Sequence, residues 1–69
     1  MANWQIVFTA DHAYRCEIVK AVLEDREIKS VILNKKDSSY NNFGSHEVYV
    51  PPEDVLRAKK IIENDIDFK

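Results

Sequence analysis

The stretch His46–Ile62, "HEVYVPPEDVLRAKKII", places a strand pattern directly beside a helix pattern. Over its first five residues apolar and polar side chains alternate, so that Val48 and Val50 face one way while Glu47 and Tyr49 face the other. Alternation with a period of two is typical of a strand that is buried on one face. We therefore predict a strand over these five residues, with both valines turned toward the core.

Directly after this strand, the spacing of the apolar residues becomes that of a helix. Proline fits the first turn of a helix, where its missing N–H would have no partner, and acidic side chains stabilise the positive N-terminal end. Pro52, Glu53 and Asp54 supply both features. We predict a helix over about Pro52–Asn64 with an apolar stripe that packs on the sheet. The stripe consists of Val55, Ala58, Ile61 and Ile62.

The N-terminal third of the chain repeats the order of strand and helix. Alternation over Trp4–Thr9 predicts a strand. Its residues expected to face the core are Trp4, Ile6 and Phe8. Asp11 suits an N-cap, because its carboxylate can accept from the amides of a first helical turn. Helical spacing then predicts a helix over about His12–Glu27. Its buried stripe is expected to be Cys16, Val19 and Leu23, with Val22 beside it.

A short β-branched segment, Ser30–Leu33, predicts one more strand, which gives the order β-α-β-β-α. Two amphipathic helices need a sheet face to cover, and a β-α-β crossover is normally right-handed. We therefore predict a single α+β domain of the ferredoxin-like class. Its three-stranded sheet has the order 2-3-1, with the third strand antiparallel in the middle and both helices on one face. The core is expected to span about residues 4–64, and the tail 65–69 is expected to fray.

Three stretches carry a resemblance to a known family: "IVFTADHAYRCEIVKAVLEDREI", "VILNKKDSSY" and "EVYVPPEDVLRAKKII". In this order they resemble the small bacterial domains of unknown function named as putative prokaryotic signal transducing proteins. The resemblance covers about Gln5 to Ile62 and contains no catalytic signature. It implies a non-catalytic regulator, similar to the PII-type regulators. Members commonly have glycine just before the second strand, where this chain has Glu27. Glycine ends a helix at little cost in the left-handed conformation, so the exact end of the first helix stays open.

The segment Lys35–Ser45 is longer than the usual hairpin loop of about 2–5 residues. Its lysines can bind an anion and its serines add donors. In PII-type regulators the long partner-contacting loop joins the corresponding strands, and the resemblance implies a similar role here. The residues predicted to contact a ligand or partner are Lys35, Lys36, Asp37, Ser38 and Tyr40. The alternative is that the polar residues only form turns, while the lysines keep an edge strand soluble.

The sheet face away from the helices is the second candidate surface. With the valines of the third strand inward, we predict that Val7, Ile32 and Tyr49 form an apolar patch on this face. Such a patch on a small domain favours docking to a protein partner or formation of a homodimer. The alternative is a scatter of surface apolar side chains, which is common. A slip of one residue in any strand would exchange its two faces.

Composition narrows the function classes. The net charge of −2 supplies no excess of basic residues for nucleic acid. A single cysteine fits a cytoplasmic, reducing compartment, and we expect neither a signal peptide nor a membrane span. His12, Cys16 and His46 lack the paired spacings of a zinc site, so we expect no metal and no cofactor.

The sequence thus predicts a non-enzymatic regulatory module that acts through the 35–45 loop and the uncovered sheet face. Its partner is expected to be a protein or a small anionic ligand. The alternative is a small enzyme, or an enzyme accessory, that acts on an anionic substrate held by the lysines. An RNA-binding module, with Tyr49 stacking on bases, is a third possibility.

Overall fold

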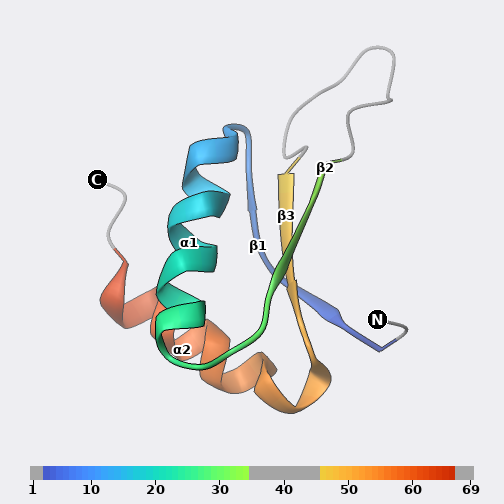
Figure 1. The fold of residues 1–69 in the computed structure, drawn as a ribbon, viewed down its shortest axis with the longest axis vertical. Coiled ribbons are helices and arrows are strands. Elements are labelled where there is room, and N and C mark those ends of the chain that lie inside the picture. Colours follow the sequence, from blue (N-terminus) through green and yellow to red (C-terminus); the bar gives the residue numbers. More distant parts are fainter. Residues whose placement is uncertain (1–2, 35–45, 67–69) are drawn as a thin grey trace.

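The computed structural model of the chain describes residues 3–34 and 46–66 (Figure 1). The predicted element order is confirmed for these residues. The elements are β1 (Gln5–Ala10), α1 (Ala13–Asp25), β2 (Val31–Asn34), β3 (His46–Val50), a short 3-10 helix η1 (Pro52–Asp54) and α2 (Val55–Asp65). The five predicted loop contacts, Lys35 to Ser38 and Tyr40, lie outside the described residues.

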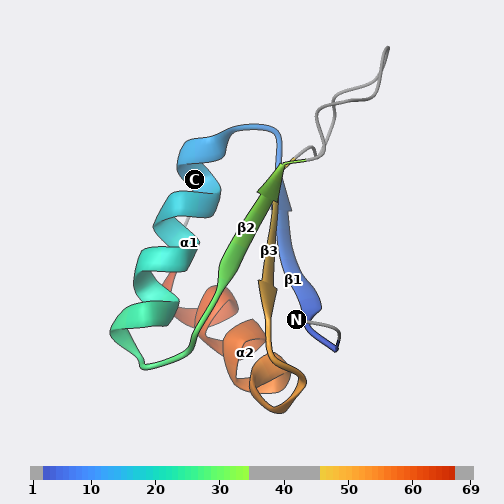
Figure 2. The same ribbon diagram turned by 45° about the vertical axis from the view of Figure 1, so that its right-hand side comes forward.

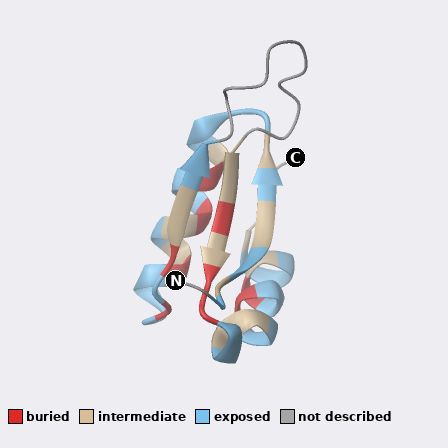
Figure 3. Cartoon of the chain, turned by 90° about the vertical axis from the view of Figure 1, so that its right-hand side faces the viewer, coloured by how far each residue is buried: buried red, intermediate tan, exposed pale blue. Residues whose placement is uncertain are grey.

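The three strands form one sheet in the order β1-β3-β2, and β3 runs antiparallel to both of its neighbours. This is the predicted α+β topology, with the third strand in the middle. Both helices lie on one face of the sheet (Figure 2). No described element covers the opposite face, which is turned toward the viewer in Figure 3. Neither helix in the described part of the chain has the length and apolar character needed to cross a membrane.

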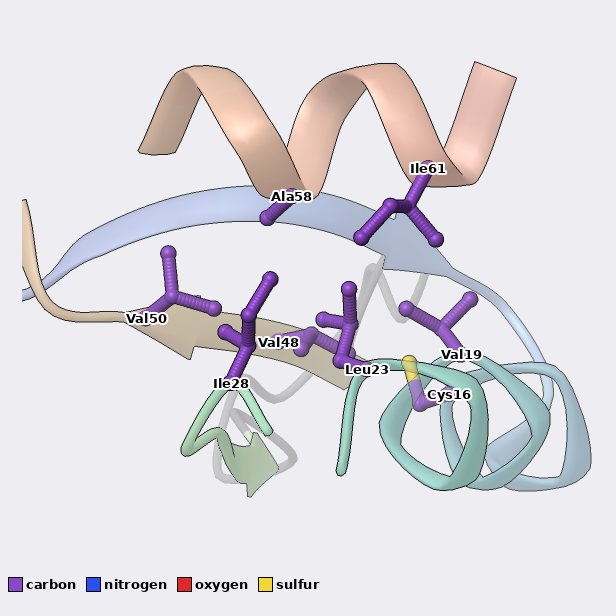
Figure 4. Close-up of a cluster of buried hydrophobic side chains, with 8 residues drawn as sticks. All are labelled: Cys16, Val19, Leu23, Ile28, Val48, Val50, Ala58 and Ile61. Atoms are coloured by element: carbon purple, nitrogen blue, oxygen red, sulfur yellow. The ribbon is translucent and has the colours of Figure 1, made fainter. Parts of the chain in front are cut away.

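The core lies between the sheet and the two helices (Figure 4). Its buried side chains come from both helices, from β3 and from the segment before β2. They are Cys16, Val19, Leu23, Ile28, Val48, Val50, Ala58 and Ile61. The predicted stripe of α1 and the inward direction of both β3 valines are therefore confirmed. In α2 the helical spacing also holds, because Val55 and Ile62 are half-buried and pack against this core.

The start of α1 corrects the sequence prediction by one residue. His12, with extended backbone (φ −118°, ψ 134°), takes the N-cap position predicted for Asp11, and its side chain makes no capping hydrogen bond. Asp11 and His12 are adjacent, and both stand just before the first helical residue, Ala13, so either could be the cap. Preference for aspartate at the cap is worth only about 1 kcal/mol, which is small enough for the geometry of the preceding strand to decide the position.

The structure shows how α1 ends with Glu27 in the position where glycine is common. Glu27 itself adopts the left-handed conformation, with φ 65°. The amide of Ile28 donates to the carbonyl of Leu23 at 2.9 Å, and the amide of Glu27 donates to the carbonyl of Glu24 at 3.0 Å. These two bonds, together with burial of Ile28 beside Leu23, make a Schellman motif. A non-glycine residue in this conformation costs about 1–2 kcal/mol, and the buried apolar contact offsets that cost.

Two polar contacts tie this end of α1 to α2. The guanidinium of Arg57 donates to the carbonyl of Arg26 at 3.0 Å, and the Arg26 side chain forms an ion pair with Asp65. Ile66, just after α2, is half-buried against the core. The packed part of the chain therefore reaches Ile66, two residues past the predicted limit, because apolar contact and ion pairing hold the end of α2. The predicted fraying of the tail 65–69 stays a prediction, and residues 67–69 lie outside the described part.

Candidate functional site

The candidate site is the sheet face that no described helix covers. In an antiparallel pair, residues directly opposite each other point to the same face. Tyr49 of β3 lies opposite Ile6 of β1 and Val31 of β2, so these three side chains form one row across the sheet. Glu47 lies opposite Thr9 and Leu33, which form a second row. We call these six residues the open face: Ile6, Thr9, Val31, Leu33, Glu47 and Tyr49.

A β-bulge in β1 decides which of its residues reach the open face. Ile6 pairs with Tyr49, whereas Phe8 pairs with Val48, so Val7 is one extra residue between two successive pairs. A bulge of this kind changes the phase of alternation within a strand. Ile6, predicted to face the core, therefore lies on the open face and is 38% exposed. Val7, predicted for the open face, is half-buried and packs against the core.

In β2 the side chains face the opposite sides of the sheet from those predicted. Ile32 pairs with the buried Val48 and packs against the core, so its predicted place on the open face is wrong. Val31 and Leu33, which alternate with Ile32, lie on the open face instead, and Leu33 is 39% exposed. A shift of one residue exchanges the two faces of a strand. The phase that the structure adopts lets Ile32 fill the space beneath α1.

The open face joins an apolar surface to one acidic side chain. The Tyr49 hydroxyl donates a hydrogen bond to Oε1 of Glu47 at 2.9 Å. These residues are two apart on β3 and both are half-buried, so the bond runs along the central strand and orients the carboxylate. Four of the six open-face residues, Ile6, Val31, Leu33 and Tyr49, present mainly apolar surface. An oriented charge within apolar surface is suited to recognition, where the apolar contact gives affinity and the charge gives specificity.

Of the three residues predicted for this surface, only Tyr49 lies on it. Sequence reasoning missed Ile6, Val31 and Leu33, which the pairing with β3 places around Tyr49 and Glu47. For β2 the sequence gives no local signal of the observed phase, because Val31, Ile32 and Leu33 are apolar in succession and the polar Asn34 alternates in phase with the core-facing Ile32. For β1 we find no local signal of the bulge, because Val7 is an ordinary strand residue.

Cys16 is the only cysteine, and it lies in the core with no exposed surface. Burial raises the pKa of the Cys16 thiol above its ordinary value of 9.0, and the negative charges of Glu17 and Glu47 act in the same direction. A raised pKa keeps the thiol protonated at neutral pH, which makes it a poor nucleophile and a poor metal ligand. Among residues 3–34 and 46–66, no three histidine, cysteine or acidic side chains gather as a metal site.

A small polar cluster stands at the exposed start of α1. The rings of His12 and Tyr14 stack with their centroids 5.7 Å apart. The Arg15 guanidinium lies 5.9 Å from the centre of the Tyr14 ring, and its Nε donates to the Tyr14 hydroxyl at 3.5 Å. These contacts are exposed, and contacts of this kind contribute about 0.5–1 kcal/mol at most.

Comparison with known proteins identifies one family. Residues 4–65 match the family described as putative prokaryotic signal transducing protein. The chain belongs to this family. The match covers β1 to α2 in full, so the open face lies within the matched part of the chain. Searches of curated proteins and of solved structures found no match.

Proposed function

We propose that this protein is a non-enzymatic regulatory module that binds a protein partner through the open face. The observation that carries the proposal is the row of Ile6, Tyr49 and Val31 across all three strands, flanked by Leu33. Ile6 and Leu33 are each more than a third exposed at the two outer strands. Apolar surface that crosses a whole sheet face is a feature of interaction sites on small domains. The family's description as signal transducing is consistent with this role.

The chemistry of the open face supports binding rather than catalysis. Its one acid, Glu47, accepts from Tyr49 and stands among apolar side chains. General acid–base catalysis needs a positioned group that reaches a proton of the substrate. A carboxylate oriented by a phenol within an apolar surface matches the central charge of a protein interface more closely.

We further propose a ferredoxin-like arrangement and a cytoplasmic location. The element order β-α-β-β-α, the strand order β1-β3-β2 and the two helices on one face support the first. Cys16 is a free, buried cysteine, which is typical of proteins in a reducing compartment, and this supports the second. We also propose that the 35–45 loop contacts the partner, as the similarity to PII-type regulators implies.

The test uses two leucines that are both exposed but lie on different surfaces. Leu33 is on the open face, whereas Leu56 is on α2 and is 80% exposed. The tagged full chain, its Leu33→Asp variant and its Leu56→Asp variant are each used to capture proteins from host lysate after cross-linking. We expect the same proteins with the unchanged chain and Leu56→Asp, and at least a tenfold loss with Leu33→Asp, because the new charge must be desolvated at the interface. An identical set with all three chains would contradict the proposal.

A further inference from the structure

The outer edge of β2 is a surface that the sheet itself leaves ready for pairing. Within residues 3–34 and 46–66 only β3 pairs with β2, so β2 lies at one border of the sheet (Figure 2). In an antiparallel pair every second residue turns its N–H and C=O groups away from the neighbouring strand. These groups of β2 point outward, where one more extended strand can pair with them. Main-chain pairing of this kind is a recurrent way of binding an extended segment of another protein.

The two borders of the sheet differ in how well they suit such pairing. β1, at the other border, carries the bulge at Val7, and bulges are among the features that keep edge strands from pairing. Charged residues and prolines within an edge strand have the same effect. β2 pairs with β3 in continuous register and contains neither a charged residue nor a proline. β2 is therefore the border that is better suited to a further strand.

The alternation of β2 continues into the residues before it. On one side of this segment Ser30 is buried and Ile32 packs against the core. On the other side Lys29 and Leu33 are exposed. Burial that alternates with a period of two is typical of extended backbone. Lys29 is thus in phase with Val31 and Leu33, and this row of the edge is cationic at one end and apolar over the rest.

Charge decides which strand fits this edge. The Lys29 side chain takes part in none of the ion pairs within the described part of the chain. Residues directly opposite each other on antiparallel strands attract when their charges are opposite and repel when they are alike. A second copy that paired Val31 with Leu33, about a two-fold axis at Ile32, would set Lys29 against position 35, which is also lysine in the sequence. An acidic residue on a foreign strand avoids this repulsion.

We infer that the outer edge of β2 receives an extended segment of a partner protein as a fourth, antiparallel strand. The segment has apolar residues opposite Leu33 and Val31 and an acidic residue opposite Lys29. This inference rests on the proposed function and names the form and chemistry of the partner. The side chains of the segment continue the rows of the open face beyond β2. Main-chain hydrogen bonds supply affinity, and the acidic residue sets the register.

The test uses seven-residue peptides of threonine with valine at the second and fourth positions and a variable sixth residue. When the first valine lies opposite Leu33, the sixth residue lies opposite Lys29. This residue is glutamate, glutamine or lysine, and affinity for the full chain is measured from NMR amide shifts. An exposed ion pair contributes modestly, so we expect the glutamate peptide to bind about fivefold more tightly than the glutamine peptide and the lysine peptide to bind most weakly. In Lys29→Gln the glutamate and glutamine peptides should bind equally.

Backbone methylation tests the main-chain contact separately from the side chains. In an added antiparallel strand, alternate N–H groups face β2 and the others face away from it. Two further glutamate peptides carry N-methyl groups on one alternate set of residues or on the other. We expect one of the two sets to weaken binding by about tenfold or more, because it removes the donors that pair with β2, and the other to leave binding nearly unchanged. Loss with both sets, or with neither, would overturn the inference.

Substitutions in the chain separate this inference from the proposed function. Leu33→Asp should abolish binding of the peptides, and Leu56→Asp should leave it unchanged. Capture of proteins from lysate should be lost with both Leu33→Asp and Lys29→Glu. Loss with Leu33→Asp alone would overturn the inference and keep the proposed function, whereas capture that neither substitution alters would overturn both.

Two further results would also contradict a foreign acidic strand. One is the absence of binding by every peptide, or tightest binding of the lysine peptide. The other is a dimer in sedimentation equilibrium that Leu33→Asp dissociates, which would assign the edge of β2 to a second copy.

Discussion

The two faces of the sheet draw on alternate residues of the same strand and differ in what covers them. On β3, Val48 and Val50 face the helices and have no exposed surface, whereas Glu47 and Tyr49 face the open side and remain half-buried. The helix-covered face holds the buried core that stabilises the fold. The open face holds apolar side chains that neither α1 nor α2 covers. Core residues and residues of the proposed docking surface thus alternate along one strand, and substitutions on the two faces should have different effects.

The largest expected effect comes from placing a charge on the covered face. Val48→Asp would bury a carboxylate with no partner, and the cost exceeds the 3–5 kcal/mol that a core of this size typically supplies. We expect the variant to be unfolded, with loss of the cooperative transition in circular dichroism. A folded Val48→Asp protein would show that the valine is not in the core.

A matched pair of neighbours in β2 sharpens the comparison. Ile32 packs against the core and Leu33 lies on the open face. We expect Ile32→Ala to lower the free energy of unfolding by about 2 kcal/mol and Leu33→Ala by about 0.5–1 kcal/mol, since only the first leaves a cavity beneath the helices. Urea denaturation measures both. The reverse ranking would mean that β2 has the phase predicted from sequence.

On the helix side, the strained end of α1 offers a gain in stability. Glycine at position 27 would adopt the left-handed conformation of Glu27 without steric cost. Part of that gain is lost to the flexibility of glycine in the unfolded chain, so we expect Glu27→Gly to raise the free energy of unfolding by about 1 kcal/mol. Glu27→Ala serves as the control and should show no comparable gain, because alanine keeps the Cβ. Equal effects of the two substitutions would exclude relief of strain as the cause.

The smallest effect concerns the buried thiol. Because the pKa of Cys16 is raised in the folded state, the folded protein holds this proton more tightly than the unfolded chain does. This stability is fully present below pH 9.0, the ordinary pKa, and is lost as the pH rises through the folded-state pKa. Urea midpoints of the unchanged chain should therefore decrease from pH 8 to pH 10.5 more than those of Cys16→Ala. The same decrease of the urea midpoint with pH in both proteins would contradict a raised pKa of Cys16 as the cause.

The sequence predicted elements whose polar and apolar residues contrast clearly. β3 alternates between valine and a polar or aromatic residue, and charged residues border the apolar stripes of α1 and α2. The inward-facing side of each of these three elements could therefore be predicted. β2 is apolar at Val31, Ile32 and Leu33 in succession, and such a run fixes no phase. In β1 the bulge depends on pairing with β3, which is a long-range contact that local alternation does not contain. An uncovered sheet face was therefore predicted, but two of the three residues predicted to lie on it, Val7 and Ile32, pack against the core.

The central claim is that Ile6, Val31 and Leu33 are open to solvent, whereas Ile32, Val48 and Val50 are covered. Methyl NMR with a soluble paramagnetic probe measures this directly, residue by residue. The account predicts strong broadening of the methyl signals of Ile6, Val31 and Leu33 and protection of those of Ile32, Val48 and Val50. Broadening of Ile32 together with protection of Val31 and Leu33 would contradict it, because β2 would then turn its other side to the solvent.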